Sequence, residues 1–201
     1  MQKEFGSFGD TAVATMQAQG NIAPEIVGIE GHYHVVCRDK DGNIKWEEEF
    51  PNLVMAVGKQ LMFDTLLRTS GTYTTVGPFL GLLNSGYTAA AADTMSITTS
   101  NEFVNYTVGG SAVRGTAVFS ASSSTGTTPA NVTTCAASAI TYTITGAGGT
   151  VAGCFLATGT GAVSTLLSTA GTLYSAGNFA TAKTTTAGDT ISVTYSTTAT
   201  S

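Results

Sequence analysis

Charged side chains are scarce in this sequence. Only 10% of the 201 residues are Asp, Glu, Lys or Arg, against roughly 25% in an ordinary soluble domain. Ala, Gly, Ser and Thr take their place, so the surface is poorly hydrated by charge. We therefore expect it to be satisfied by hydroxyl groups or covered by partners, and a free monomer is disfavoured.

Basic residues and histidines are also few. The eight Lys and Arg residues are scattered and the net charge is −5, whereas nucleic-acid binding needs clustered cations. His32 and His34 lie on one face of an expected strand, Cys37 falls on the opposite face, and no third ligand follows at a telling spacing. We predict no nucleic-acid partner and no metal site.

The chain also lacks the usual signatures of catalysis. Two histidines on one strand face leave few ways to build a Ser–His or Cys–His triad, and no glycine-rich turn is followed by the Lys-Ser/Thr of a phosphate-binding loop. We predict no enzymatic activity, no cofactor and no small-molecule substrate.

Cysteine pairs and long apolar runs are missing as well. Cys37, Cys135 and Cys154 are odd in number and widely spaced, so we expect no disulfide framework and synthesis in a reducing cytoplasm. No apolar run approaches the 18 residues or so of a membrane span, and the first residues lack a secretory pattern. We therefore expect neither a membrane association nor a signal peptide.

Strand patterns begin near residue 31. A β-rich run at 32–38 and another at 44–50 flank the turn sequence Asp39-Lys-Asp-Gly-Asn43, which predicts a hairpin over 32–50. Alternation places Ile44, Trp46 and Glu48 on one face of the second strand. Its other face carries Lys45, Glu47 and Glu49.

One helix is predicted, over residues 53–67. Asn52 is placed to cap its N-terminus, and apolar residues recur at a spacing that predicts a wide buried stripe. Gly58 costs about 1 kcal/mol relative to Ala inside a helix. We expect another backbone to approach it closely.

The rest of the chain predicts short strands separated by Gly, Ser and Thr. Residues 121–128, 157–164 and 180–188 are expected to be loops. The eight candidate strands are Tyr73–Val76, Phe79–Leu83, Glu102–Val108, Thr116–Ser120, Ile140–Thr145, Val151–Ala157, Thr172–Ser175 and Thr190–Ser196. This pattern predicts a mainly β chain folded as an antiparallel, jelly-roll-like β-sandwich.

Charge marks the clearest boundary along the chain. Residues 1–68 hold six of the eight basic and ten of the thirteen acidic residues. We expect residues 1–28 to form an extended N-terminal arm and residues 29–201 to form a single sandwich domain that includes the hairpin and the helix.

Several segments resemble small virion proteins of tailed bacteriophages. The resemblance spans about residues 40–196. It is carried by residues 41–54, 77–84, 87–95, 114–119, 151–156, 171–174 and 188–193. It implies a capsid decoration (cement) protein built on a β-sandwich, located on the virion surface and bound to the major capsid protein and to copies of itself. A phage tail or fibre component involved in host attachment is the alternative.

Large apolar and acidic side chains in the first 50 residues are the expected contacts with the capsid or with neighbouring subunits. They are Phe5, Phe8, Trp46, Glu47, Glu49 and Phe50. A carbohydrate-active enzyme or lectin on the same fold is a third hypothesis. It would need a carboxylate pair at a set separation, drawn from Glu47, Glu48, Glu49, Glu102 and Asp189.

Overall fold

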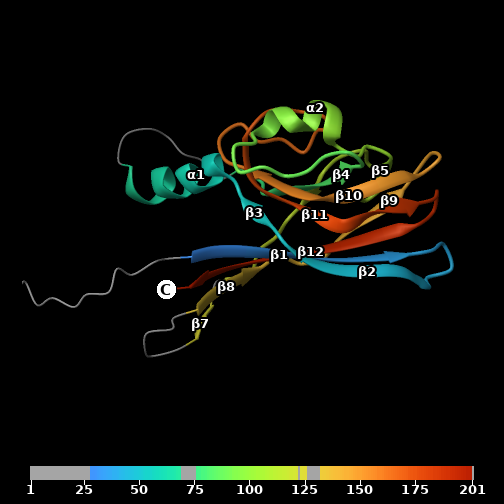
Figure 1. Cartoon of the computed structure of the whole chain (residues 1–201), viewed down its shortest axis with the longest axis horizontal. Helices are drawn as coiled ribbons and strands as arrows, with labels where there is room; N and C mark the ends of the chain where they lie inside the picture. The colour runs from blue at the N-terminus through green and yellow to red at the C-terminus, as the bar shows by residue number, and fades with distance from the viewer. Residues whose placement is uncertain (1–27, 69–75, 122, 126–131, 201) are drawn as a thin grey trace, which may run out of the picture.

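Two antiparallel β-sheets pack face to face in this computed structural model (Figure 1). The structure describes residues 28–68, 76–121, 123–125 and 132–200. The first sheet has seven strands and the second has five. The predicted antiparallel β-sandwich is confirmed, and its jelly-roll connectivity stays a prediction.

The first sheet runs in the order β2-β1-β12-β8-β7, and β9 joins it by pairing with both β12 and β5. Its strands are β1 (Gly28–Arg38), β2 (Ile44–Pro51), β5 (Tyr106–Thr107), β7 (Ser123–Thr125), β8 (Val132–Ala136), β9 (Ile140–Ile144) and β12 (Thr190–Thr200).

The second sheet runs in the order β3-β11-β10-β4-β6. Its strands are β3 (Leu53–Val54), β4 (Phe79–Asn84), β6 (Gly115–Thr116), β10 (Gly149–Thr158) and β11 (Thr172–Thr185). The described helical elements are α1 (Ala56–Leu67), the 3₁₀ turn η1 (Met95–Ile97) and α2 (Thr98–Asn101).

The predicted hairpin is confirmed as β1 and β2. Asp39 Oδ1 accepts hydrogen bonds from the backbone N–H groups of Asp41 and Asn43, both at 2.9 Å. Gly42 adopts a φ of +88°, in the left-handed region that the turn requires. Hydrogen bonds from the Asn43 side chain and backbone lower the pKa of Asp39.

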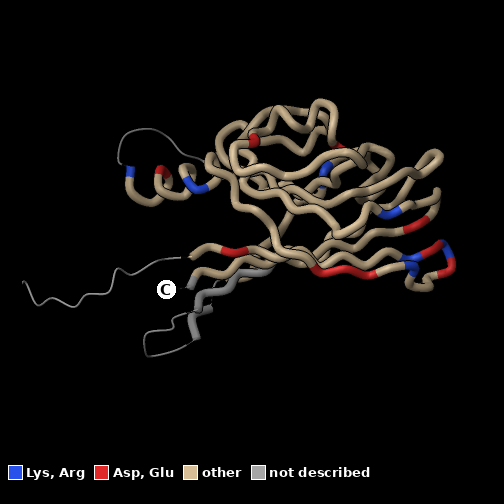
Figure 2. Tube along the Cα trace, viewed as in Figure 1, with Lys and Arg blue, Asp and Glu red and all other residues tan. Residues whose placement is uncertain are grey.

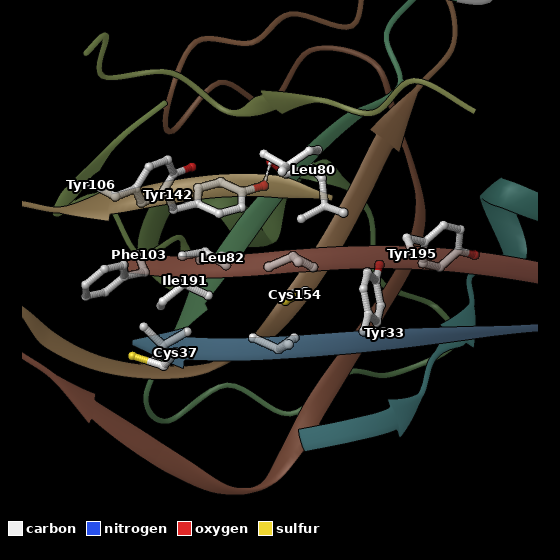
Figure 3. Packing of buried hydrophobic residues seen from close by; sticks show 14 of the residues in the cluster. Tyr33, Cys37, Leu80, Leu82, Phe103, Tyr106, Tyr142, Cys154, Ile191 and Tyr195 are labelled. Carbon is white, nitrogen blue, oxygen red and sulfur yellow. Dashed lines mark hydrogen bonds between the residues drawn. The ribbon is translucent and has the colours of Figure 1, made fainter. Parts of the chain in front are cut away.

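The core forms where inward-facing residues of the two sheets meet (Figure 3). β1 and β12 pair along eleven residues, so that Tyr33 lies opposite Tyr195 and Val35 opposite Val193. Alternate residues of both strands therefore point inward together. The second sheet meets them with Leu80, Leu82, Cys154 and Leu156.

Buried tyrosine hydroxyls tie the two sheets together. Tyr142 OH donates to the Leu80 carbonyl at 2.7 Å, and Tyr33 OH lies 3.1 Å from Ser175 Oγ. Burial raises the pKa of both phenols well above its usual value, so both hydroxyls stay protonated and able to donate. Each phenol thus fills core volume and satisfies a polar group across the sandwich.

The outer face of the second sheet carries a smaller apolar cluster. β10 is buried on both of its faces from Val151 to Thr158. The loop before α2 and the start of α1 cover it. The buried members of this cluster are Met55, Leu83, Met95, Phe155, Ala157, Leu173 and Ala176.

The start of the predicted helix is wrong. Leu53 and Val54 form β3, which pairs with Ser175 and Ala176 of β11, and the helix begins only at Ala56. Asn52 does not cap it, because its side chain donates instead to Tyr195 OH at 3.0 Å. Tertiary pairing has overridden the local capping pattern.

Several strand boundaries also differ from the prediction. β11 runs through the first part of the expected 180–188 loop, β7 lies within the expected 121–128 loop, and β8 was not predicted. The expected strands at 102–108 and 116–120 shorten to β5 and β6. Residues 73–75 lie outside the described residues, and Val76 belongs to no strand.

The change in charge near residue 68 does not divide the sandwich. β1 and β2 come from the charge-rich part, yet β1 pairs along its whole length with β12 from the charge-poor part. Figure 2 shows the charges gathered along β2 and around the hairpin turn. Both regions of the sequence therefore build one sheet.

Candidate functional site

The predicted contact residues of β2 divide between its two faces. Phe50 is buried in the core, where its ring packs 5.4 Å from Tyr33 and 5.0 Å from Phe179. Trp46 is half-buried and its ring lies 5.4 Å from Phe179. These two side chains contact β11 within the same chain, which leaves Phe50 no surface to offer a partner. Phe5 and Phe8 lie outside the described residues.

Glu48 of β2, in the first sheet, bonds to two residues of β11 in the second sheet. Its Oε1 accepts the backbone N–H of Ala180 at 2.6 Å, and its Oε2 lies 2.9 Å from Lys183 Nζ. Both partners belong to the second half of β11, which has no neighbour among the described strands on its outer edge because β3 pairs only with Ser175 and Ala176. A carboxylate that occupies an unpaired strand N–H protects this edge from pairing with another chain.

Glu47 and Glu49 are exposed on the outer face of β2. His34 Nε2 lies 2.7 Å from Glu47 Oε1, and His34 pairs in register with Glu49. Among the described residues no group of three His, Cys, Asp or Glu side chains is placed to hold a metal. Cys37 points into the core, and burial raises the pKa of its thiol to about 11.

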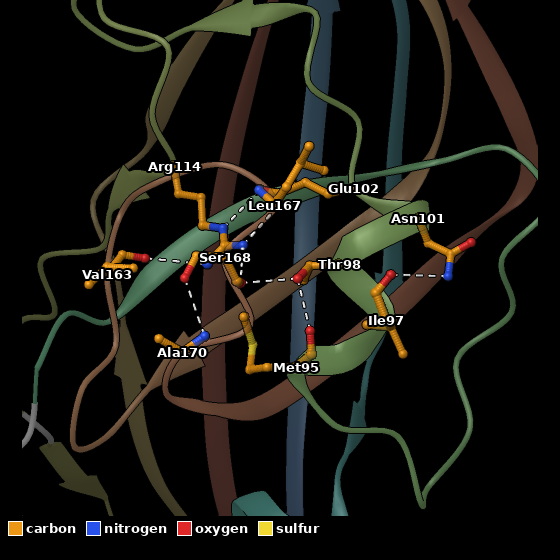
Figure 4. Close-up of polar contacts among 10 residues, drawn as sticks. All are labelled: Met95, Ile97, Thr98, Asn101, Glu102, Arg114, Val163, Leu167, Ser168 and Ala170. Atoms are coloured by element: carbon orange, nitrogen blue, oxygen red, sulfur yellow. Dashed lines mark hydrogen bonds and ion pairs between the residues drawn. The ribbon is translucent and has the colours of Figure 1, made fainter.

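An ion pair lies fully buried under the loops on the second sheet (Figure 4). Arg114 Nε and Nη2 donate to the two carboxylate oxygens of Glu102, each at 2.8 Å. Nη2 also donates to the Ser168 carbonyl at 2.8 Å, and the guanidinium lies 5.2 Å from the ring centre of Phe155. Such bidentate pairs are strong and geometrically specific.

This pair joins three segments that are distant in sequence. Glu102 Oε2 also accepts the N–H of Leu167, at 2.6 Å, and Leu167 adopts a φ of 60°, which is uncommon for a residue other than Gly. Thr98 adds a hydrogen bond of 3.0 Å to the Ser168 carbonyl. Both side chains are enclosed and bound by neighbouring groups, so the pair holds the loops in place.

Two other carboxylates proposed for catalysis are also engaged by cations. Asp189 is buried and lies 2.6 Å from Lys45 Nζ, and Glu48 is bound by Lys183 as described above. Burial opposes the ionised form of Asp189, but hydrogen bonds from Lys45 and Thr186 prevail and its pKa is lowered. Both carboxylates therefore form ion pairs with lysines of the same chain.

The surface that sequence reasoning did not anticipate is the outward face of α1, which we define by Phe63, Leu66 and Leu67. These side chains are 64%, 76% and 73% exposed. The helix was expected to bury a wide stripe, yet only Gly58 is buried. A surface helix normally buries its apolar side chains against the core, but here three of the largest face solvent.

The inward face of α1 explains its one buried residue. A side chain at Gly58 would bring Cβ into collision with the carbonyl oxygen of Tyr174 on β11. The predicted close approach of another backbone is confirmed. Further along the helix, Tyr174 OH lies 3.6 Å from Met62 Sδ, and the end of α1 extends beyond the sheet (Figure 1).

Two neighbouring apolar hollows lie at the α1 end of the sandwich, and we call them together the α1 groove. One, of about 210 Å³, lies against the inner side of the helix. The other, of about 240 Å³, opens between the two sheets, and both are bordered by Thr158 and Tyr174. The remaining lining side chains include Leu61, Met62, Leu66, Pro78, Phe119, Leu156, Tyr195 and Thr197.

The arrangement favours contact with another apolar surface. Apart from Lys59 and the ion pair of Asp64 with Arg68, α1 and the groove beside it carry mainly large apolar side chains. No helix within the described ranges is long and apolar enough to cross a membrane. Comparisons with protein-family models, with curated proteins and with solved structures find no match.

Proposed function

We propose that this chain is a non-enzymatic structural protein that attaches to a larger assembly through the outward face of α1. The observation that carries the proposal is the exposure of Phe63, Leu66 and Leu67 on one helix. Full burial of such a side chain contributes about 1.5 to 3 kcal/mol. A cluster of three is therefore enough to anchor a repeated contact.

The assembly we propose is the shell of a tailed bacteriophage, with this chain as a decoration or cement protein on the virion surface. Support comes from the sequence resemblance to small phage virion proteins and from the low content of charge. Its partners would be the major capsid protein and further copies of itself. Repetition of one modest contact around a symmetric shell multiplies its effect through avidity.

Glu47 and Glu49 are candidates for a second, polar contact. Both are exposed on the outer face of β2, within the acidic tract seen in Figure 2. Charges of this kind at the rim of an interface set the rate and specificity of association more than its affinity. We expect their removal to make attachment less dependent on salt.

Particle binding tests the main proposal. Shells that lack the protein are mixed with the purified chain, and bound copies are counted by quantitative mass spectrometry. The double variant Phe63→Ser/Leu67→Ser should lose about 2 to 4 kcal/mol of contact energy, a roughly 30- to 900-fold weaker binding. The control is Ile44→Ser, which removes a side chain that is 51% exposed at the hairpin end of the molecule.

Equal binding of the α1 variant and the wild-type chain would refute the role of this face. The copy number separates the two phage roles, because hundreds of copies per particle indicate shell decoration and a handful indicate a tail or fibre. Absence of the chain from every particle fraction would refute the virion proposal as a whole.

A further inference from the structure

The α1 groove lies at the place where the N-terminal segment leaves the sandwich. β1 begins at Gly28, which pairs with Thr200, and three residues later Gly31 pairs with Thr197, a groove residue. Figure 1 shows the start of β1, the end of β12 and α1 at the same end of the molecule. The preceding segment therefore starts within a few residues of the groove.

A third hollow connects this starting point to the helix. It holds about 310 Å³ and is bordered by Ile29 and Gly31 of β1, Leu53 and Val54 of β3, and Lys59 of α1. This hollow thus lies between the first residues of β1 and the first turn of α1.

Residues 1–27 have the composition that this groove suits. They lie outside the described residues, but the sequence shows large apolar side chains at intervals, separated by small ones, with only four charges. The apolar members are Met1, Phe5, Phe8, Val13, Met16, Ile22, Ile26 and Val27. Burying Phe or Met side chains in an apolar hollow is favourable because it removes apolar surface from water.

The N-terminal segment is long enough to reach the α1 groove of its own chain. Twenty-seven extended residues span up to about 90 Å, whereas a 12-residue helix such as α1 is about 18 Å long. A short tether gives its own site an effective concentration in the millimolar range. Even a weak affinity then favours the chain's own segment over one from a neighbour.

From these observations we infer that residues 1–27 dock into the α1 groove of their own chain, with the phenylalanines at positions 5 and 8 as the main anchors. The docked segment covers the inner side of α1 and the open end of the sandwich. It leaves Phe63 and Leu67 of the outward face free, whereas Leu66 lies on the border between that face and the groove. The inference stands on the groove and on the chain's exit point, and it does not depend on the proposed virion role.

Disulfide trapping in the full-length chain tests this inference. The variant Phe8→Cys/Leu66→Cys pairs the segment with the groove, and Phe8→Cys/Ile44→Cys pairs it with the far end of the sandwich as a control. Cys135 is replaced by Ser in both, while Cys37 and Cys154 are buried. Oxidation is followed at low micromolar concentration, and peptide mass spectrometry identifies each disulfide.

We expect the 8–66 disulfide to form within monomers at least tenfold faster than the 8–44 disulfide. Equal rates would show that the segment has no preference for the groove and would overturn the inference. Disulfide-linked dimers in place of monomers would show that a second copy supplies the segment, which also overturns it.

A dye-binding measurement provides an independent readout. The full-length variant Phe5→Ser/Phe8→Ser should open the groove and raise the fluorescence of added 1-anilinonaphthalene-8-sulfonate severalfold over the wild-type chain. The matched variant Ile44→Ser should not. An unchanged signal in the Phe5→Ser/Phe8→Ser chain would contradict docking, whatever the outcome of particle binding.

Discussion

The buried pair of Arg114 and Glu102 should dominate the response of the fold to point mutation. Both side chains are fully excluded from solvent, so Glu102→Leu leaves a guanidinium buried without its counter-charge. Removing one partner of a buried pair costs about 3 to 5 kcal/mol. A domain of ordinary size is stable by only about 5 to 15 kcal/mol, so the single variant loses a large fraction of its stability.

The double variant Glu102→Leu/Arg114→Met isolates the interaction between the two charges. It removes both ions together, and replacing a buried pair by apolar groups is often neutral. Here it also leaves the Leu167 N–H and the Val163 carbonyl without their present partners, at about 1 to 3 kcal/mol for a buried unsatisfied group. Ser168 keeps its hydrogen bond from Thr98.

We therefore expect the double variant to cost about as much as either single variant, and much less than their sum. The corresponding coupling energy is at least about 2 kcal/mol. Urea unfolding followed by circular dichroism measures each variant. With a slope near 2 kcal/mol/M, a loss of about 4 kcal/mol lowers the midpoint by about 2 M.

Additive costs in this mutant cycle would refute the reasoning, because they would mean that the two charges do not stabilise each other. Single variants that cost under about 1 kcal/mol would refute it as well. That result would show that water or a rearranged loop can replace the missing partner.

Three further changes test other contacts of the fold. Gly58→Ala would normally stabilise a helix by about 1 kcal/mol, but contact with Tyr174 should make it cost about 1 to 3 kcal/mol in thermal unfolding, with exposed Gln60→Ala as the neutral control. Glu48→Ala frees the Ala180 N–H and should promote self-association in light scattering, whereas Glu49→Ala should not. The depressed pKa of Asp189 contributes stability that is complete above about pH 5 and is lost as pH falls below about 3.9. Lys45→Met should therefore lower stability at pH 7 by about 1 to 2 kcal/mol and flatten the acid side of the stability curve, and an unchanged curve would contradict this.

Elements with local signals could be predicted from the sequence. The hairpin follows from its Asp-Gly turn and two flanking runs, and β12 follows from the alternation of Ile191, Val193 and Tyr195, all buried. The inward placement of Glu48 follows from the same alternation. In each case neighbouring residues alone determine which side chains face the core.

Elements defined by pairing with distant strands could not be predicted. β7 (Ser-Ser-Thr) lies in a stretch expected to be a loop, and β8 (Val-Thr-Thr-Cys-Ala) lies where no element was predicted, because both runs are short and carry few large apolar side chains. The second half of β11 looks equally plain, and its length follows from its register with β10. Strand propensity depends on such context more than helix propensity does.

The exposed face of α1 could not be predicted either, because its exposure also depends on distant parts of the chain. The apolar residues of α1 predict burial, and sequence alone does not show that the second sheet covers one side of the helix only. The ion pair was equally hidden, because Glu102 and Arg114 are held by carbonyl and N–H groups from residues 163–168, about fifty or more positions away. No spacing within a single segment encodes such a contact.

Two surfaces of the molecule differ in how they can take part in association: the strand edge on the β2–β11 side and the exposed face of α1. On the β2–β11 side, Glu48 blocks a free strand N–H and Trp46 packs against Phe179, so the sandwich resists strand-to-strand growth there. The same fold leaves Phe63, Leu66 and Leu67 in solvent on α1. Exposed side chains of this size would favour indiscriminate aggregation unless a partner covers them. Because Glu48 and Trp46 protect part of this edge while the α1 face is open, the proposed assembly through α1 is the contact we expect to be specific.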